Sequence, residues 1–165
     1  MIHRATTDDI PAIRSMAETV FRQTYAEILS PEQIEYMMDM MYSERSLKDQ
    51  MDSGVTFFLA GGDKGYASYR YCGRDDDGHE LFHLEKLYVM PSEQKTGLGR
   101  RLFDTVVEEI RKVSKGHSRI ELNVNRFNPA VSFYEHIGMH KDRQGDFPIG
   151  NGFYMNDYIM VIDLC

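Results

Sequence analysis

Tryptophan is absent from the sequence, cysteine occurs only twice and proline only five times. The two cysteines, Cys72 and Cys165, are too few for the disulfide framework of a secreted domain, so we expect reduced thiols and a cytoplasmic protein. The chain has no run of about 18 apolar residues, and its first residues show no basic stretch followed by an apolar one. The sequence therefore predicts neither a membrane span nor a targeting segment.

Basic residues are also scarce, because 19 Lys and Arg stand against 26 Asp and Glu and leave a net charge of -7. The basic surface that neutralises phosphates in nucleic-acid-binding proteins is therefore not expected here. An acidic surface favours a cationic partner instead. With 165 residues, 42% of them hydrophobic, and no internal repeat or linker, the chain fits one domain spanning residues 1–165.

Hydrophobic periodicity divides the first half of the chain into helices and then strands. Apolar residues recur at helical spacing over 10–21, and a second helix is predicted from Ser30-Pro31 to about Gly54. Strands are predicted at the following ranges: 2–6, 55–60, 66–72 and 81–89.

The second half opens with the most regular amphipathic helix, over 98–113. A strand over 120–124 follows, and Asn128-Pro129 then begins a short helix that Gly138 closes. The last strands are predicted at 140–143 and 156–164. This order indicates an α/β fold with one mixed, mostly antiparallel sheet of about seven strands and helices on both faces.

A glycine-containing loop, Gln94 to Arg100, joins the strand over 81–89 to the regular helix. Backbone N–H groups at a helix start attract anions, and Gly97 and Gly99 let a phosphate approach closely. The loop does not match the P-loop pattern Gly-x4-Gly-Lys-Ser/Thr, and Leu102 stands where a dinucleotide fingerprint requires its third glycine. Taken alone, the glycine loop is as consistent with a packing role for its glycines as with phosphate binding.

Two motifs together resemble the GNAT superfamily of N-acetyltransferases. The first is Leu87-Tyr88-Val89 followed by Gln94-x-x-Gly97-x-Gly99. The second is Leu122-x-Val124 followed by Asn128-Pro129-Ala130, Phe133-Tyr134 and Gly138. Each lies on the element that the family uses, and the matched core covers about residues 81 to 140. The resemblance implies a single-domain fold whose sheet splays between the fourth and fifth strands.

The resemblance also implies acetyl-CoA as co-substrate, without a metal. In such folds the fourth strand pairs with the pantetheine arm, the loop amides hold the pyrophosphate, and a backbone N–H near Leu87 binds the thioester oxygen. The expected cofactor-binding residues are Leu87, Tyr88, Val89, Gln94, Lys95, Thr96, Gly97, Leu98, Gly99, Arg100 and Asn128.

Acetyl transfer needs a proton for the departing thiolate and an acceptor for the proton of the amine. The resemblance points to Tyr134 as the acid, against the alternative that its ring only packs beside Phe133. Glu85 or His83 is the candidate base, since both share a strand face with Leu87. An ordinary ion pair of Glu85 is the alternative.

The acceptor is predicted only as a primary amine, either a small cationic or polyamine-like molecule or a protein amino group. By resemblance, Tyr25, Tyr36 and Met37 border its pocket. A CoA-binding sensor without turnover is the alternative function, and a homodimer is left open because dimers are common in the family.

A zinc hydrolase is the third alternative, because His79-Glu80-Leu81-Phe82-His83 matches the pattern His-Glu-x-x-His. That pattern binds zinc only on a helix. Here it enters a predicted strand, where residues four apart lie about 13 Å from each other, so we interpret the match as chance. Asp75-Asp76-Asp77-Gly78 likewise lacks the full pattern of a calcium loop.

Overall fold

The computed structural model describes residues 1–164, so the predicted thiol of Cys165 lies outside the described residues. Over that range, the strands are β1 Ile2–Arg4, β2 Thr56–Ala60, β3 Gly65–Arg74, β4 Glu80–Val89, β5 Ser118–Asn125, β6 His140–Gly150 and β7 Phe153–Leu164. The helices are α1 Ile10–Tyr25, α2 Pro31–Tyr42, α3 Glu44–Asp52, α4 Leu98–Val113 and α5 Ala130–His136, with short 3-10 helices η1 Thr7–Asp9 and η2 Pro91–Glu93. Within residues 1–164, none of the helices has both the length and the apolar character that crossing a bilayer requires.

The seven strands form one sheet in the order β1-β2-β3-β4-β5-β7-β6. The pairs β1–β2, β2–β3, β5–β7 and β6–β7 are antiparallel, whereas β4 and β5 are parallel. The ladder between β4 and β5 joins Glu80–His83 to Ser118–Glu121, although β4 continues to Val89. The predicted mixed α/β sheet is confirmed.

The chain groups into two compact units. The first unit contains Met1–Arg70 and Glu85–Glu109, and the second contains Tyr71–Leu84 and the chain from Ile110 onward. Strands β3 and β4 and helix α4 therefore contribute residues to both units.

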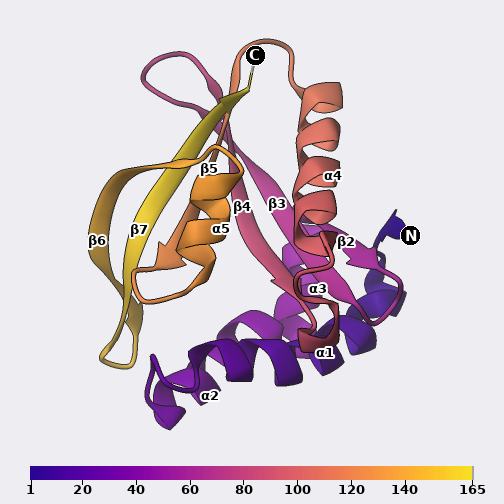
Figure 1. Ribbon diagram of the computed structural model, residues 1–165, viewed down its shortest axis with the longest axis vertical. Helices are drawn as coiled ribbons and strands as arrows, with labels where there is room; N and C mark the ends of the chain where they lie inside the picture. Colours follow the sequence, from indigo (N-terminus) through magenta and orange to yellow (C-terminus); the bar gives the residue numbers. More distant parts are fainter. Residues whose placement is uncertain (165) are drawn as a thin grey trace. The chain divides into compact units, whose positions relative to one another are not determined.

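The helices of the first unit begin where serine and threonine hydroxyls cap them. Thr6 and Asp9 form a capping box ahead of α1, and the Ser30 hydroxyl accepts from Gln33 N at the start of α2. The single helix predicted from residue 30 to Gly54 is wrong, because Ser43 is extended (φ -61°, ψ 153°) and divides it into α2 and α3 (Figure 1). The Ser43 hydroxyl caps α3 by accepting from Ser46 N at 3.1 Å.

Aromatic side chains fill the core of the first unit. The Tyr66 hydroxyl donates to the Tyr42 hydroxyl at 2.7 Å, and both residues are buried. Burial raises the pKa of each phenol well above its usual 10. Phe21 of α1 packs edge-on against Tyr42 and Tyr88, so these rings tie α1 and α2 to β3 and β4.

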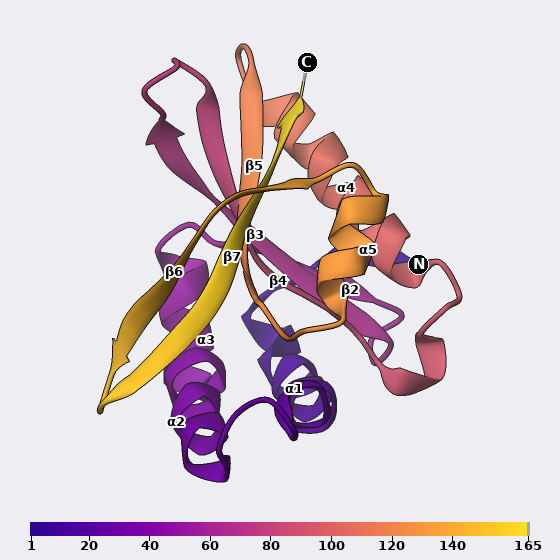
Figure 2. The ribbon, with the colours of Figure 1, turned by 60° about the vertical axis from the view of Figure 1, so that its left-hand side comes forward.

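The second unit is built on β5, β7 and β6, and the last two strands form a long hairpin (Figure 2). This hairpin is longer than the predicted strands over 140–143 and 156–164. Gly145, Phe147 and Ile149 are half-buried between exposed neighbours, so β6 alternates like a strand. Because the composition of β6 is polar and glycine-rich, as in a loop, this alternation could not be recognised from the sequence.

Candidate functional site

The glycine loop of the first unit has the backbone shape of an anion cradle. Lys95 (φ 67°) and Gly97 (φ 87°) both adopt positive φ angles between the end of η2 and the start of α4. The Thr96 hydroxyl donates to Glu93 O at 2.6 Å, which fastens the turn from within. Successive residues of opposite handedness direct neighbouring N–H groups toward one side of the chain, which forms a concave nest for negative charge.

Six consecutive backbone amides, those of residues 95–100, donate to no acceptor in hydrogen-bonding geometry among residues 1–164. The Arg101 amide is the first that is bonded within the chain, to Gly97 O at 3.1 Å. Lys95, Thr96, Gly97 and Arg100 are exposed, whereas Leu98 is buried and Gly99 is half-buried, so it is the loop end of this row that faces solvent. Together with the positive end of the α4 dipole, these amides can hold a phosphate or pyrophosphate.

The strand that leads into the loop is held from one side by Gly65 of β3. A Cβ atom there would lie 2.9 Å from Tyr88 O and 3.2 Å from Leu102 Cδ1, so only glycine allows this close approach. Leu87, Tyr88 and Val89 are half-buried. The Gln94 side-chain amide donates to Val89 O at 3.4 Å, a long contact that another donor can replace.

Tyr134 and Asn128 belong to the second unit. Tyr134, on α5, is 7% exposed, and its ring packs edge-on against Phe133 with centroids 5.4 Å apart. The packing named as the alternative to its acid role is therefore present. Asn128 is also buried, and its Oδ1 accepts from Ala130 N at 2.9 Å at the start of α5. That contact closes an Asx turn just ahead of α5 and fixes the side chain of Asn128.

The two candidate bases are both engaged by charged neighbours. Glu85 forms an ion pair with Arg70, which is the alternative that the sequence left open for it. His83 Nδ1 lies 3.3 Å from Glu121 Oε1, and this contact holds the pKa of Glu121 below its usual value. A carboxylate beside His83 fixes its ring orientation, as an imidazole base requires. The catalytic role of either residue stays a prediction.

Lys86 is a buried cation that the sequence analysis missed. Its Nζ donates to Gln50 Oε1 at 2.6 Å and lies over the rings of Phe57 and Tyr42, at 5.3 and 5.6 Å from their centroids. Burial lowers the pKa of Lys86 to about 8. Its position in β4 could have predicted its burial, because strand alternation places Lys86 on the same face as the buried Phe82 and Leu84.

The residues predicted for the acceptor pocket differ in environment. Tyr25 packs on Phe21 (4.6 Å between centroids), and its hydroxyl lies 3.3 Å from the Tyr88 hydroxyl. Met37 is 3% exposed and part of the core, whereas Tyr36 is half-buried. Tyr25 is therefore brought together with a predicted cofactor-binding residue, and Met37 is a packing residue of α2.

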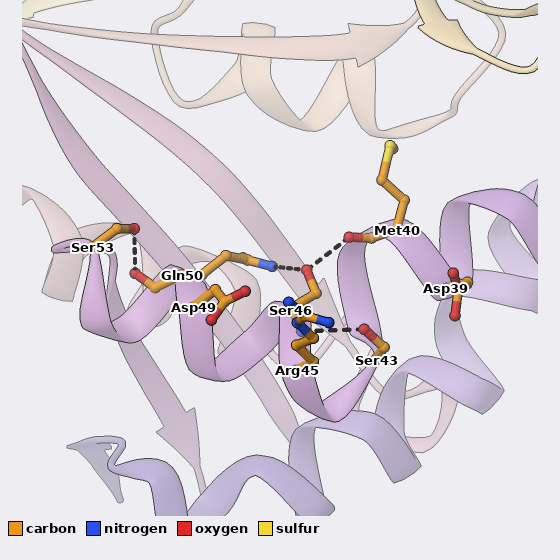
Figure 3. A pocket seen from close by; sticks show the side chains of 8 residues that line it. All are labelled: Asp39, Met40, Ser43, Arg45, Ser46, Asp49, Gln50 and Ser53. Atoms are coloured by element: carbon orange, nitrogen blue, oxygen red, sulfur yellow. Dashed lines mark hydrogen bonds between the residues drawn. The ribbon is translucent and has the colours of Figure 1, made fainter.

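An open pocket of about 480 Å³ lies on α2 and α3 (Figure 3). Its lining residues are Asp39, Met40, Ser43, Arg45, Ser46, Asp49, Gln50 and Ser53. The lining groups bond mainly to one another: Gln50 Nε2 donates to Ser46 Oγ, which donates to Met40 O. None of the predicted site residues lines this pocket.

The His-Glu-x-x-His segment lies on strand β4 and the residue before it, as predicted, and its two histidines have different partners. His83 faces Glu121, whereas His79 lies with Asp75 and Asp77 in a group whose ligand atoms are within 4.8 Å of one another. Asp75 Oδ1 accepts from the backbone amides of Asp77 and His79, and Arg119 lies 3.4 Å from its Oδ2. The arrangement is a braced turn that already has a cation beside it.

Residues 25–160 match the model of the acetyltransferase (GNAT) domain. Because this match covers most of the chain, the protein belongs to the GNAT acetyltransferases. The predicted family and enzyme class are confirmed.

Relatives and solved structures agree with this assignment. An uncharacterized N-acetyltransferase in the pepI 3' region of Lactobacillus delbrueckii subsp. lactis is 26% identical over 161 residues, covering 88% of this chain and 93% of the relative. The fold is similar to PaiA N-acetyltransferase from Thermoplasma acidophilum in complex with coenzyme A, with a TM-score of 0.80, 21% identity, and coverage of 99% and 98% of the two chains. It is also similar to the ribosomal-protein-S18-alanine N-acetyltransferase of Escherichia coli, with a TM-score of 0.66, 20% identity, and coverage of 99% and 92%.

Proposed function

We propose that the protein transfers the acetyl group of acetyl-CoA to a primary amine by direct attack of the amine on the thioester. The observation that carries the proposal is the row of six amides over 95–100, in an exposed loop, that lack acceptors within the described part of the chain. A pyrophosphate supplies the acceptors that this row needs. The similar PaiA structure was solved with coenzyme A, which supports the same ligand here.

The proposed roles of the cofactor-binding residues follow the family's pattern. Amides 95–100 hold the pyrophosphate, the backbone of Leu87–Val89 pairs with the pantetheine arm, and Asn128 contacts the cofactor. These assignments extend the family's pattern to the positions of this chain that match it. Acetyl-CoA supplies the activated acyl group.

The chain's own residues move two protons. Glu85 or His83 accepts the proton that the amine nitrogen loses when it bonds to the carbonyl carbon. Tyr134 donates its hydroxyl proton to the sulfur as the carbon–sulfur bond breaks and the bonding electrons leave with the sulfur. The reference pKa of a phenol is about 10, so Tyr134 begins each cycle protonated at neutral pH.

The test is release of free CoA thiol from acetyl-CoA in the presence of a panel of primary amines. Tyr134→Phe should lower kcat by about 100-fold at unchanged affinity for CoA, because a positioned acid contributes that much. Tyr154→Phe, in the same unit but 51% exposed, is the matched control and should keep wild-type turnover.

Glu85→Gln and His83→Gln separate the two candidate bases, since only loss of the true base removes the rise in rate with pH that deprotonation of that base produces. Tight CoA binding with no thiol release from any amine would instead favour a sensor without turnover. Turnover that survives Tyr134→Phe unchanged would remove Tyr134 from the mechanism.

A further inference from the structure

Asp157 of β7 is a buried carboxylate that the reaction described above does not use. It is 1% exposed, and its Oδ2 accepts from Asn123 Nδ2 on β5 at 3.2 Å. Its Oδ1 has no hydrogen-bond partner among residues 1–164. A buried carboxylate oxygen without a donor is costly, and proteins keep few such groups.

The nearby cation Arg126 does not satisfy this oxygen. Arg126 is held by two backbone oxygens, those of Gly145 at 3.1 Å and Asp157 at 3.5 Å, and by the Asp146 carboxylate at 2.9 Å. On the same face, Arg143 is paired with Glu121 and with its neighbour Asp142. Burial accordingly raises the pKa of Asp157 despite the nearby charge of Arg126.

On one side of Asp157 the shared face of β6 and β7 is apolar, whereas Arg143 of β6 lies on the other side. Gly145 is its cross-strand neighbour, and the next pair on the same face is Phe147 with Met155, both half-buried. A Cβ atom on Gly145 would lie 2.9 Å from the Phe147 ring, so that ring leans back over Gly145 toward the position of Asp157. Phe147 and Met155 thus form a short apolar strip beside Asp157, whose Oδ1 lacks a donor among residues 1–164.

The shape and charge of this place suit an alkylammonium group. An ammonium donates a charge-assisted hydrogen bond to the open carboxylate oxygen, and its alkyl carbons lie against apolar side chains. An aromatic ring beside the carboxylate adds attraction for a cation. A carboxylate or phosphate on the same ligand would be repelled by Asp157.

We propose that Asp157 binds the ammonium group of the amine acceptor, with the acceptor's alkyl chain along Phe147 and Met155. The bound ammonium releases one proton to solvent, and its neutral nitrogen then attacks the thioester while the base accepts the second proton. This inference rests on the proposed function and narrows its substrate class to alkyl amines that carry no acid group near the amine. The half-buried Phe147 ring is the part that turns aside to admit the ligand. Asn123 is a positioning residue, because it holds the other carboxylate oxygen in place.

The experiment compares Asp157→Asn with the wild-type protein in the thiol-release assay. The expected result is a KM for n-butylamine raised about tenfold or more, the usual effect of losing a hydrogen bond to a charged group. The affinity for CoA should not change. Asp163→Asn is the matched control, because that carboxylate lies on the same strand but is exposed and paired with Arg119, and it should leave KM unaltered.

Thermal unfolding distinguishes a binding role from a structural one. Because Asp157 is buried with an unsatisfied oxygen, Asp157→Asn should leave the Tm equal or higher. An unchanged KM for n-butylamine would overturn the inference, whether or not the Tm is lowered. Such a result would show that an internal water or the surrounding packing satisfies the Asp157 oxygen.

The outcome also separates this inference from the proposed function. If the wild-type protein releases no thiol with any amine, the proposed function fails, and binding of n-butylammonium followed by NMR then decides about Asp157 alone. Saturable shifts of β6–β7 amides that Asp157→Asn abolishes would support the site, whereas shifts absent from the wild-type protein, or retained in Asp157→Asn, would reject it.

Discussion

The glycine loop of the first unit and Asp157 of the second unit are opposite in kind. Among the described residues 1–164, the loop presents six N–H donors that lack acceptors, and Asp157 presents one acceptor oxygen that lacks a donor. The loop is exposed, so water satisfies its amides until an anion arrives. Asp157 is 1% exposed, so its deficit is a standing cost of the folded state.

The difference shows what each kind of unsatisfied hydrogen-bonding group indicates. An exposed row of donors defines a ligand of one charge and demands little of the fold, and backbone geometry alone creates it. A buried acceptor requires surrounding packing to maintain it, and such departures from full satisfaction are concentrated at functional sites. Lys86 provides the third case, a buried cation that does have a hydrogen-bond acceptor.

Lys86 should give the largest effect on stability. Its pKa falls from 10.5 to about 8 on folding, and each unit corresponds to about 1.4 kcal/mol, so the charged form costs about 3 kcal/mol at pH 7. Lys86→Met should therefore raise the free energy of unfolding at pH 7 by up to that amount. Urea denaturation monitored by circular dichroism measures it.

The pH dependence supplies the control for Lys86. Between pH 8 and 10.5 the unfolded chain holds a proton that the folded chain has released, so stability should rise with pH in this window. Above about pH 10 the raised pKa values of Tyr42 and Tyr66 act in the opposite direction. Lys86→Met should abolish the rise, while Lys48→Met, at an exposed ion pair, should keep it. A flat wild-type profile would mean that Lys86 is not destabilised by burial.

Gly97 should give the next largest effect, on cofactor binding. A β-branched residue at φ 87° is strained by about 1–3 kcal/mol, so Gly97→Val should distort the row of amides and weaken CoA binding about tenfold to a hundredfold. Calorimetric titration with CoA measures this. Gly62→Val is matched to it, because Gly62 also has a positive φ, 78°, and open space around it. Equal affinities in the two variants would refute the role of the loop.

Most of the fold was predictable because its elements are periodic and their ends are marked. Helix α4 was predicted with its observed bounds, since apolar residues recur regularly after Gly97. The break at Ser43 was not predicted, because a serine inside an apolar repeat does not show whether its hydroxyl faces solvent or caps a new helix. Strand β6 was predicted too short, because its inward positions carry few strongly apolar residues.

The candidate site was predictable to the extent that backbone geometry determines it. Glycines ahead of a regular helix indicated the free amides of the loop, and motif spacing placed Tyr134 on α5. The partners of Glu85 and His83 come from other strands, so register had to be known first. Asp157 lies within the predicted part of β7, yet sequence alone cannot show that one of its oxygens lacks a donor.

Asn123 should give the smallest effect, and it tests the comparison most directly. Asn123→Ala removes the hydrogen-bond donor of Asp157 Oδ2, so it should cost about 1–2 kcal/mol of unfolding free energy. When Asn123→Ala is made in the Asp157→Asn variant, it should lower the unfolding free energy by less, because no buried charge is then left without a donor. A double-mutant cycle by urea denaturation measures this coupling. Additive losses of unfolding free energy in the two variants would show that Asp157 does not depend on the Asn123 donor. Of the two regions compared, only the loop would then have unsatisfied groups that indicate a ligand.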